Sequence, residues 1–251
     1  MHKYLHIVSR YKLHFIGLFL IFLMTNLVTL QAARSDEIMD ARHIIDTATV
    51  AIEKIRSEYS PKERWDSLIQ RTKGIFIVPA YYKIGFIIGG SYGDGVLLKR
   101  NRDGGFGDPA FYRITSGSVG LQVGLQSSEI AFLILSDKGM EAILKDEFKV
   151  GANIGIAVGA VGAGAEAATT SNIGKEILAF SQSAGLFAGG SLVGSIIKPR
   201  EDLNAAVYGN SQNKPNIIIK QNRLAYSSQL KQAIVEGLSD RKGLPLPKQI
   251  A

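Results

Sequence analysis

The chain has 251 residues, of which 46% are hydrophobic and 20% are charged, and its formal net charge is +7. This composition fits one globular domain with short additions, and it excludes a disordered or collagen-like chain. Because the sequence contains no Cys and only four His, it excludes disulfide frameworks, thiolate zinc sites, Cys nucleophiles and a His-rich metal site. We therefore expect a binding protein rather than an enzyme, with no cofactor and no metal.

Residues 1–32 have the pattern of a signal peptide. The first fourteen residues are basic without an acid, residues 15–30 are almost entirely apolar, and small residues follow at Ala32 and Ala33. The apolar run is longer than a usual signal core and shorter than a typical membrane-spanning helix. We expect a cleaved signal, with a retained membrane anchor and a buried core helix as alternatives. The first two place the rest of the chain in the periplasm or cell envelope.

Residues 36–73 predict two N-terminal helices. Over 36–58, apolar residues recur at steps of three and four, with Ile45 and Ile52 in the middle of the stripe. A capping box at 60–63 begins the second helix, which should bury Trp65 and Leu68 or Ile69. We expect the first stripe to pack on the domain. Contact with a membrane or a partner is the alternative.

A glycine-rich core follows over 74–209, where 24 of the 27 glycines lie. Short apolar runs recur there about every ten residues between glycine-rich breaks, which predicts an antiparallel sandwich or barrel. The segments 93–95 and 102–105 have the composition of hairpin turns. Ser136 should begin a short helix that presents Met140 and Ile143 on one side.

Glycines also interrupt the apolar runs themselves, where they weaken a strand unless another group approaches the backbone closely. They allow either tight packing or a groove for an extended apolar ligand. The candidate positions are Gly85, Gly89, Gly90, Gly120, Gly124 and Gly189.

Residues 200–207 predict another short helix. Residues 210–251 then read as a polar loop, a helix over 222–238 and a mobile tail. The expected fold class is α+β: an antiparallel glycine-rich sandwich or barrel core with N-terminal amphipathic helices and a C-terminal helix.

No catalytic constellation emerges from the sequence. Residues 90–95 and 159–164 resemble phosphate loops only loosely, and no G-x-S-x-G motif occurs. Asp94, Asn101, Asp103 and Asp108 could supply oxygen ligands for Ca²⁺, but their spacing matches no calcium loop, so turn chemistry explains them better. His43 lies on the first predicted helix as a partly exposed residue. A hydrolase that uses Ser and Asp without His is the weaker alternative.

The basic residues form several short groups rather than one patch. A mild, dispersed excess of basic over acidic residues suits contact with an anionic surface such as lipid headgroups. Alternatively, these residues lie on solvated faces. The excess does not indicate nucleic-acid binding. The groups nearest the first expected strands supply the candidate headgroup contacts, in which basic side chains donate charge-assisted hydrogen bonds to phosphates. These candidates are Lys73, Lys83, Lys99, Arg100 and Arg102.

Seven ordered segments resemble the SYLF domain, also called the Ysc84 actin-binding domain. They are residues 74–79, 83–90, 93–96, 109–111, 117–124, 185–195 and 208–209, and the preceding helix resembles the usual lead-in of the family. The sequence departs from many relatives in having Phe106 in place of Trp and no lipobox Cys.

The resemblance implies lipid binding, including phosphoinositide binding in eukaryotic relatives, and export in bacterial relatives. Actin binding belongs to some fungal and plant relatives. We expect actin to be no partner of an exported chain. The expected partner is a phospholipid or membrane surface. An envelope protein bound through the first helix is the alternative.

Overall fold

The computed structural model describes residues 33–59, 62–85, 88–119, 124–152, 154–160, 175–181 and 192–236. The expected signal peptide, the first two residues of the capping box and the expected C-terminal tail lie outside these ranges. Gly120 and Gly189 also lie outside them.

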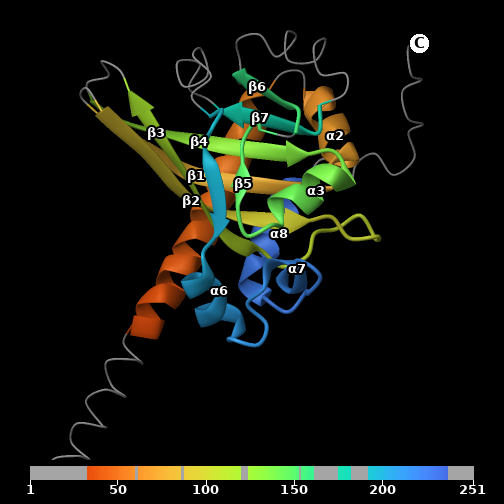
Figure 1. Cartoon of the computed structure of the whole chain (residues 1–251). Coiled ribbons are helices and arrows are strands. Elements are labelled where there is room, and N and C mark those ends of the chain that lie inside the picture. The colour runs from red at the N-terminus through yellow and green to blue at the C-terminus, as the bar shows by residue number, and fades with distance from the viewer. Residues whose placement is uncertain are drawn as a thin grey trace, which may run out of the picture.

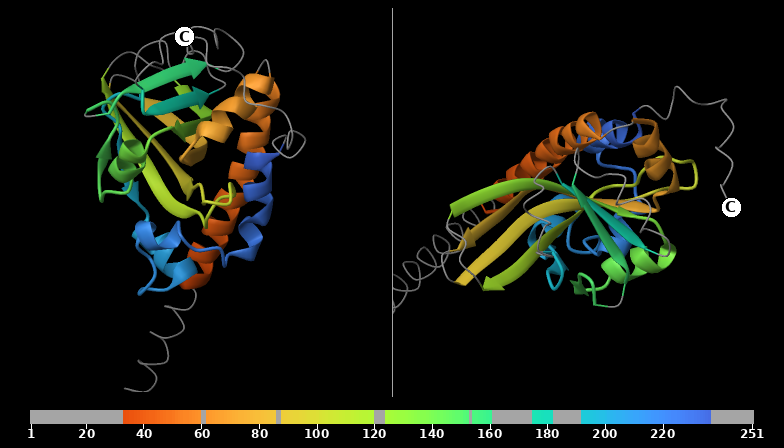
Figure 2. Two further views of the ribbon diagram at one scale, coloured as in Figure 1. Left: turned by 90° about the vertical axis from the view of Figure 1, so that its right-hand side faces the viewer. Right: turned by 90° about the horizontal axis from the view of Figure 1, so that it is seen from above.

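The described strands form one eight-stranded sheet in the order β5-β8-β3-β2-β1-β4-β7-β6, curled into a half-barrel (Figures 1 and 2). Neighbouring strands pair antiparallel except β6 and β7, which are parallel. The strands are β1 (Gly74–Gly85), β2 (Ile88–Lys99), β3 (Ala110–Val119), β4 (Gly124–Ile134), β5 (Phe148–Lys149), β6 (Ile156–Ala160), β7 (Ile177–Ser181) and β8 (Ile196–Pro199).

Helices surround this sheet. The N-terminal helix covers residues 33–58. The others are α2 (Lys62–Arg71), α3 (Asp137–Ile143), α6 (Glu201–Tyr208), α7 (Pro215–Ile218), the 3₁₀ turn η1 (Ala225–Ser227) and α8 (Ser228–Val235). The α+β prediction is confirmed, with an antiparallel glycine-rich core, N-terminal helices and a C-terminal helix.

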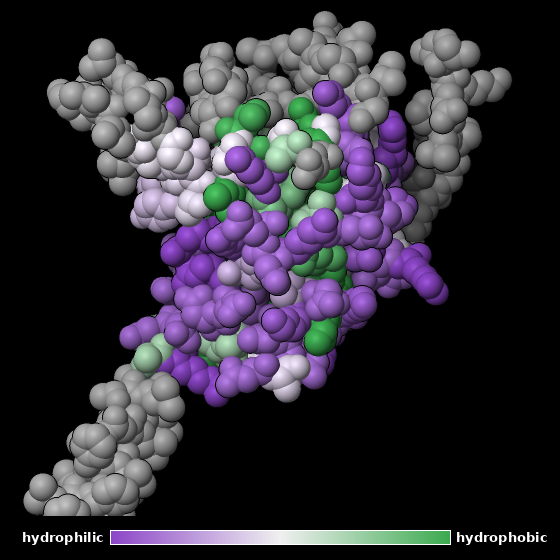
Figure 3. Space-filling model, viewed as in Figure 1, coloured by the Kyte–Doolittle hydropathy of each residue, from purple (hydrophilic) through white to green (hydrophobic). Residues whose placement is uncertain are grey.

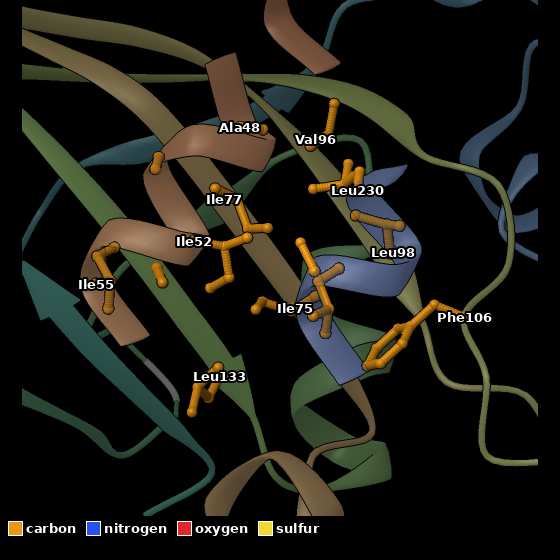
Figure 4. Close-up of a cluster of buried hydrophobic side chains, with 14 of the residues drawn as sticks. Ala48, Ile52, Ile55, Ile75, Ile77, Val96, Leu98, Phe106, Leu133 and Leu230 are labelled. Carbon is orange, nitrogen blue, oxygen red and sulfur yellow. The ribbon is translucent and has the colours of Figure 1, made fainter. Parts of the chain in front are cut away.

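One face of the sheet packs against the N-terminal helix, α2 and α8 (Figure 4). The apolar stripe of the N-terminal helix is buried as expected, since Ile45, Ile52 and Ile55 are almost fully covered. Trp65 from α2 is also buried, and its ring lies 5.7 Å from that of Phe180 in β7. The N-terminal helix is therefore part of the core.

The opposite face of the sheet is buried too, against α3, α7 and the segment around β5. Successive side chains of a strand point to opposite faces, so Ile75 and Ile77 enter the first core while Phe76 and Val78 enter the second. Burial of both faces explains why the sequence shows continuous apolar runs instead of an apolar-polar alternation.

The predicted hairpin turn at 93–95 is wrong, because these residues lie inside β2 and pair with β3. Their glycines accommodate the irregular β1–β2 pairing, whose register shifts between Ile77 and Tyr82. A Cβ on Gly95 would lie 2.3 Å from the carbonyl oxygen of Ile77. The Asp94 carboxylate accepts hydrogen bonds from Arg113 and Arg200 at 2.6 Å. The other predicted turn is confirmed, with Gly104 at a φ of 91°.

Asp108 is also not a turn residue, since it is completely buried. Its carboxylate accepts hydrogen bonds from the backbone N–H groups of Arg223 and Leu224 and from Lys231 Nζ at 2.7 Å. These bonds attach the start of the C-terminal region to the β2–β3 connection. In the described part of the predicted 222–238 helix, residues 222–224 are irregular and helical structure begins with η1 and α8.

Candidate lipid-binding surface at the distal end of the sheet

The four central strands extend beyond their neighbours at one end of the sheet. Strand β8 pairs with β3 only over Tyr112–Thr115, and β7 pairs with β4 only over Ile130–Ile134. Beyond these points, β1 to β4 continue as a ribbon that projects from the body of the protein (Figures 1 and 2). We call this ribbon the distal end. It comprises residues 81–85 of β1, 88–92 of β2, 115–119 of β3 and 124–128 of β4.

An aromatic pair lies on this distal end. Tyr82 and Tyr92 are directly opposite each other in the β1–β2 register, and their ring centroids are 5.5 Å apart. Tyr92 is 44% exposed, which makes it one of the few large apolar side chains open to solvent among the described residues. Next to the pair, Gly90 pairs with Gly117. Nothing would lie within 4 Å of a Cβ on Gly117, so the surface beside the rings is open.

The distal end contains one charged residue, Lys83, and no acid. Its strand ends are otherwise rich in Gly, Ser and Thr. In Figure 3 this region, at the upper left, is pale because its residues have intermediate hydropathy. A surface without acids costs little to bring against anionic headgroups. Tyr and Lys are residues that favour the membrane–water interface because each combines an apolar body with a polar tip.

The structure divides the five predicted headgroup residues between the two ends of the sheet. Lys73, Lys99 and Arg102 lie at the proximal end, where Gly74 pairs with Lys99. Lys83 lies at the distal end, roughly 30 Å away along β1 at the usual rise of a strand. They therefore do not form one basic cluster.

Arg100 is held inside the proximal end. Its Nε donates to the carbonyl oxygen of Thr72 at 2.8 Å, and its terminal nitrogens donate to the carbonyl oxygens of Ile69 and Gly104. The guanidinium also lies 4.7 Å from the centre of the Phe106 ring. Burial lowers the pKa of Arg100. These contacts connect α2 to the turn after β2, so the donors of Arg100 are already engaged within the fold.

The four candidate glycines within the described ranges, Gly85, Gly89, Gly90 and Gly124, lie at the distal end. Gly85 pairs with both Gly89 and Gly124, and Gly90 lies next along β2. Sequence reasoning missed the Tyr82–Tyr92 pair because it placed the hairpin turn at 93–95. A turn placed at the centre of the 83–90 segment would have set these two tyrosines opposite each other.

Neither a metal centre nor a membrane-spanning helix is found in the part of the chain that the structure describes. Its His, Asp and Glu residues form no group of three that could hold a metal ion. No helix within the same ranges has the length and apolarity needed to cross a bilayer.

Comparison with known proteins identifies the family. The model of the Ysc84 family, described as "Las17-binding protein actin regulator", matches residues 115–236. Residues 115–236 are thus a region of the Ysc84 family. The family resemblance noted in the sequence is thus confirmed, and this family is one of regulators and binding proteins.

Curated relatives of the Ysc84 family include proteins from fungi and mammals. The chain is 31% identical over 147 residues to Protein YSC84 from Saccharomyces cerevisiae, a match that covers 57% of this chain and 31% of the relative. LAS seventeen-binding protein 3 from the same species is 30% identical, with 57% and 32% coverage. SH3 domain-containing YSC84-like protein 1 from Bos taurus is 30% identical, with 56% and 41% coverage. The chain therefore spans about a third of the yeast relatives it matches.

Proposed function

We propose that this protein is a non-enzymatic lipid-binding protein of the cell envelope that attaches to membrane surfaces by the distal end of its sheet. The observation that carries the proposal is the pair of Tyr82 and the exposed Tyr92 on a projecting ribbon whose one charged residue is Lys83. The predicted N-terminal signal supplies the location. Headgroup phosphates are the expected ligands, with phosphoinositides as one class among them.

The contact combines apolar burial with electrostatic attraction. Full burial of a large apolar side chain contributes about 1.5–3 kcal/mol, so the two tyrosines, already partly covered, contribute roughly 2 kcal/mol together. Lys83 adds about 1 kcal/mol on an anionic surface. Together these values describe weak, reversible attachment, which suits a peripheral membrane protein.

Liposome flotation tests this proposal. Replacement of both rings in a Tyr82→Ser/Tyr92→Ser variant should lower recovery on anionic vesicles by about tenfold or more in partition coefficient. Lys83→Gln should lower recovery on anionic vesicles and leave recovery on neutral vesicles unchanged. High salt should reproduce the effect of Lys83→Gln because it screens the same attraction.

Matched controls come from exposed residues elsewhere in the described structure. Val193 is 61% exposed, so Val193→Ser removes an exposed apolar side chain outside the distal end. Lys214→Gln removes an exposed lysine. Recovery as high for the double tyrosine variant as for Val193→Ser would refute the proposed contact surface.

A protein-interaction module is the second candidate function. It is favoured by the name of a relative, LAS seventeen-binding protein 3, and by two exposed apolar side chains on the N-terminal helix, Met39 at 60% and Val50 at 62%. Asp46 and Glu53 flank Val50 in a groove shared with α8. A partner that carries basic and apolar residues would complement this surface.

Point variants separate the two functions, because deletion of the helix would remove core residues such as Ile52. Met39→Glu/Val50→Glu should abolish capture of an envelope protein partner while leaving vesicle flotation unchanged. Loss of flotation in this variant, with partner capture intact, would count against an interaction role for the helix.

A further inference from the structure

A cavity of about 410 Å³ lies between α3 and the segment that contains β5. Its apolar lining comes from Ala142, Phe148, Ala152 and Ile154. Phe148 and Ile154 are at least nine-tenths buried. Figure 3, which views the molecule from this side, shows hydrophobic residues exposed between hydrophilic ones. The volume falls within the usual range for small-molecule sites, and an apolar floor favours a hydrocarbon group.

Three lysines stand around this floor. Lys138 pairs with Glu176 at 3.3 Å. Within the described ranges, the ammonium groups of Lys145 and Lys149 form no ion pair. Both residues are exposed at the rim.

The acids of the rim do not cancel this charge. Glu147 is neutralised by Lys198, whose Nζ lies 2.7 Å from its carboxylate. Glu141 is the remaining carboxylate in the lining. Among the described lining residues, Lys145, Lys149 and Glu141 are the charged groups outside these ion pairs, which leaves a net positive rim above an apolar floor.

We propose that this cavity binds a single-chain amphiphile with an anionic head, such as a fatty acid or an alkyl phosphate. The chain would contact Phe148 and Ile154, and the carboxylate or phosphate would accept hydrogen bonds from Lys145 and Lys149. The cavity lies beside α3, which follows the proximal end of β4, so this binding does not depend on membrane attachment by the distal end.

Both parts of the ligand are needed for affinity. Exposed lysines bind an isolated phosphate weakly because both partners are strongly hydrated. A neutral alcohol of the same chain length fills the floor and leaves the lysines without a counter-charge. Each partial ligand should therefore bind more weakly than the complete amphiphile.

Isothermal titration of the full chain tests this proposal, with decyl phosphate and decanoate as probes below their micelle concentrations. Inorganic phosphate and decanol are the comparison ligands. The Lys145→Gln/Lys149→Gln variant should weaken binding of both anionic probes by about tenfold or more, because two near-surface charges are lost. Glu141→Gln should strengthen it.

Two further variants keep the test decisive. Ala152→Trp fills the cavity from an exposed rim position and should abolish binding without disturbing the core. Lys214→Gln/Lys220→Gln removes two exposed lysines outside the lining and should leave binding unchanged. Three results would overturn the proposal. The rim and control double variants bind the anionic probes with equal affinity, inorganic phosphate binds as well as decyl phosphate, or neither anionic probe binds. The Tyr82→Ser/Tyr92→Ser variant should retain full binding, which separates this site from the distal end.

Discussion

Replacement of Gly95 by Ala should destabilise the protein strongly, because this glycine lies where β2 crosses the irregular part of β1. A Cβ there would lie 2.3 Å from the carbonyl oxygen of Ile77 and 3.0 Å from a ring carbon of Phe76. The first neighbour is backbone in a buried strand, so a change of side-chain rotamer cannot relieve the clash. Either β1 moves or the β1–β2 pairing breaks.

The cost follows from the usual effect of overpacking. Extra atoms in a well-packed core destabilise by about 1–3 kcal/mol, and a clash with backbone belongs at the upper end of this range. About 3 kcal/mol corresponds to a fall in Tm of roughly 6–12 °C for a chain of this size. Gly117→Ala is the matched control because its Cβ would meet nothing within 4 Å. In a strand it should stabilise by about 0.5–1 kcal/mol through lower chain entropy.

Thermal unfolding followed by circular dichroism and by fluorescence of Trp65, the single tryptophan, measures both variants. The expected result is a large fall in Tm for Gly95→Ala and no fall for Gly117→Ala. Equal Tm values for the two variants would refute the argument that the glycines inside β2 serve close strand packing.

Three further predictions concern the ionic groups. Asp108→Asn should lower the free energy of unfolding by about 3 kcal/mol, because Lys231 loses the charge of its buried partner. The C-terminal region should then be cleaved faster by a protease, and an unchanged cleavage rate would contradict this prediction. Arg100→Gln should lower Tm, while the protein that remains folded still floats with anionic vesicles. Loss of flotation at an unchanged Tm would instead indicate that Arg100 binds lipid headgroups. Hydrogen bonds from Arg200 lower the pKa of Asp202, so its stabilising contribution is present above about pH 4 and lost as pH falls further. Asp202→Asn should therefore reduce the loss of stability on acidification. The measurement is the free energy of unfolding as a function of pH, and the same decrease below about pH 4 in the variant and the original protein would contradict this prediction.

The fold class was predictable because its signals are local. The three- and four-residue spacing around Ile45 and Ile52 indicated a packed helix, and the structure confirms it. The turn predicted at 93–95 was wrong because the same glycines that permit a turn also permit close contact between strands. Only the register between β1 and β2 distinguishes these two roles, and that register depends on contacts between distant residues.

The candidate site was predictable only in part. Lys83, Gly85 and Gly90 lie at the distal end, whereas Lys73 and Lys99 lie at the other end of the same strands. Their separation follows from the length of β1, which continues through a bulge where the sequence suggested two separate runs. The buried role of Arg100 was also hidden, because the carbonyl groups that it binds come from α2 and a turn that the chain order does not place together.

The orientation of the protein on a membrane is the most direct test of the account. Because the chain has no Cys, single cysteines introduced by Gly117→Cys at the distal end and Arg102→Cys at the proximal end can carry an environment-sensitive fluorophore without background labelling. On addition of anionic vesicles, we predict a blue shift and protection from aqueous quencher at residue 117 and neither at residue 102. A blue shift at residue 102 alone, or at neither position, would contradict membrane attachment by the distal end of the sheet.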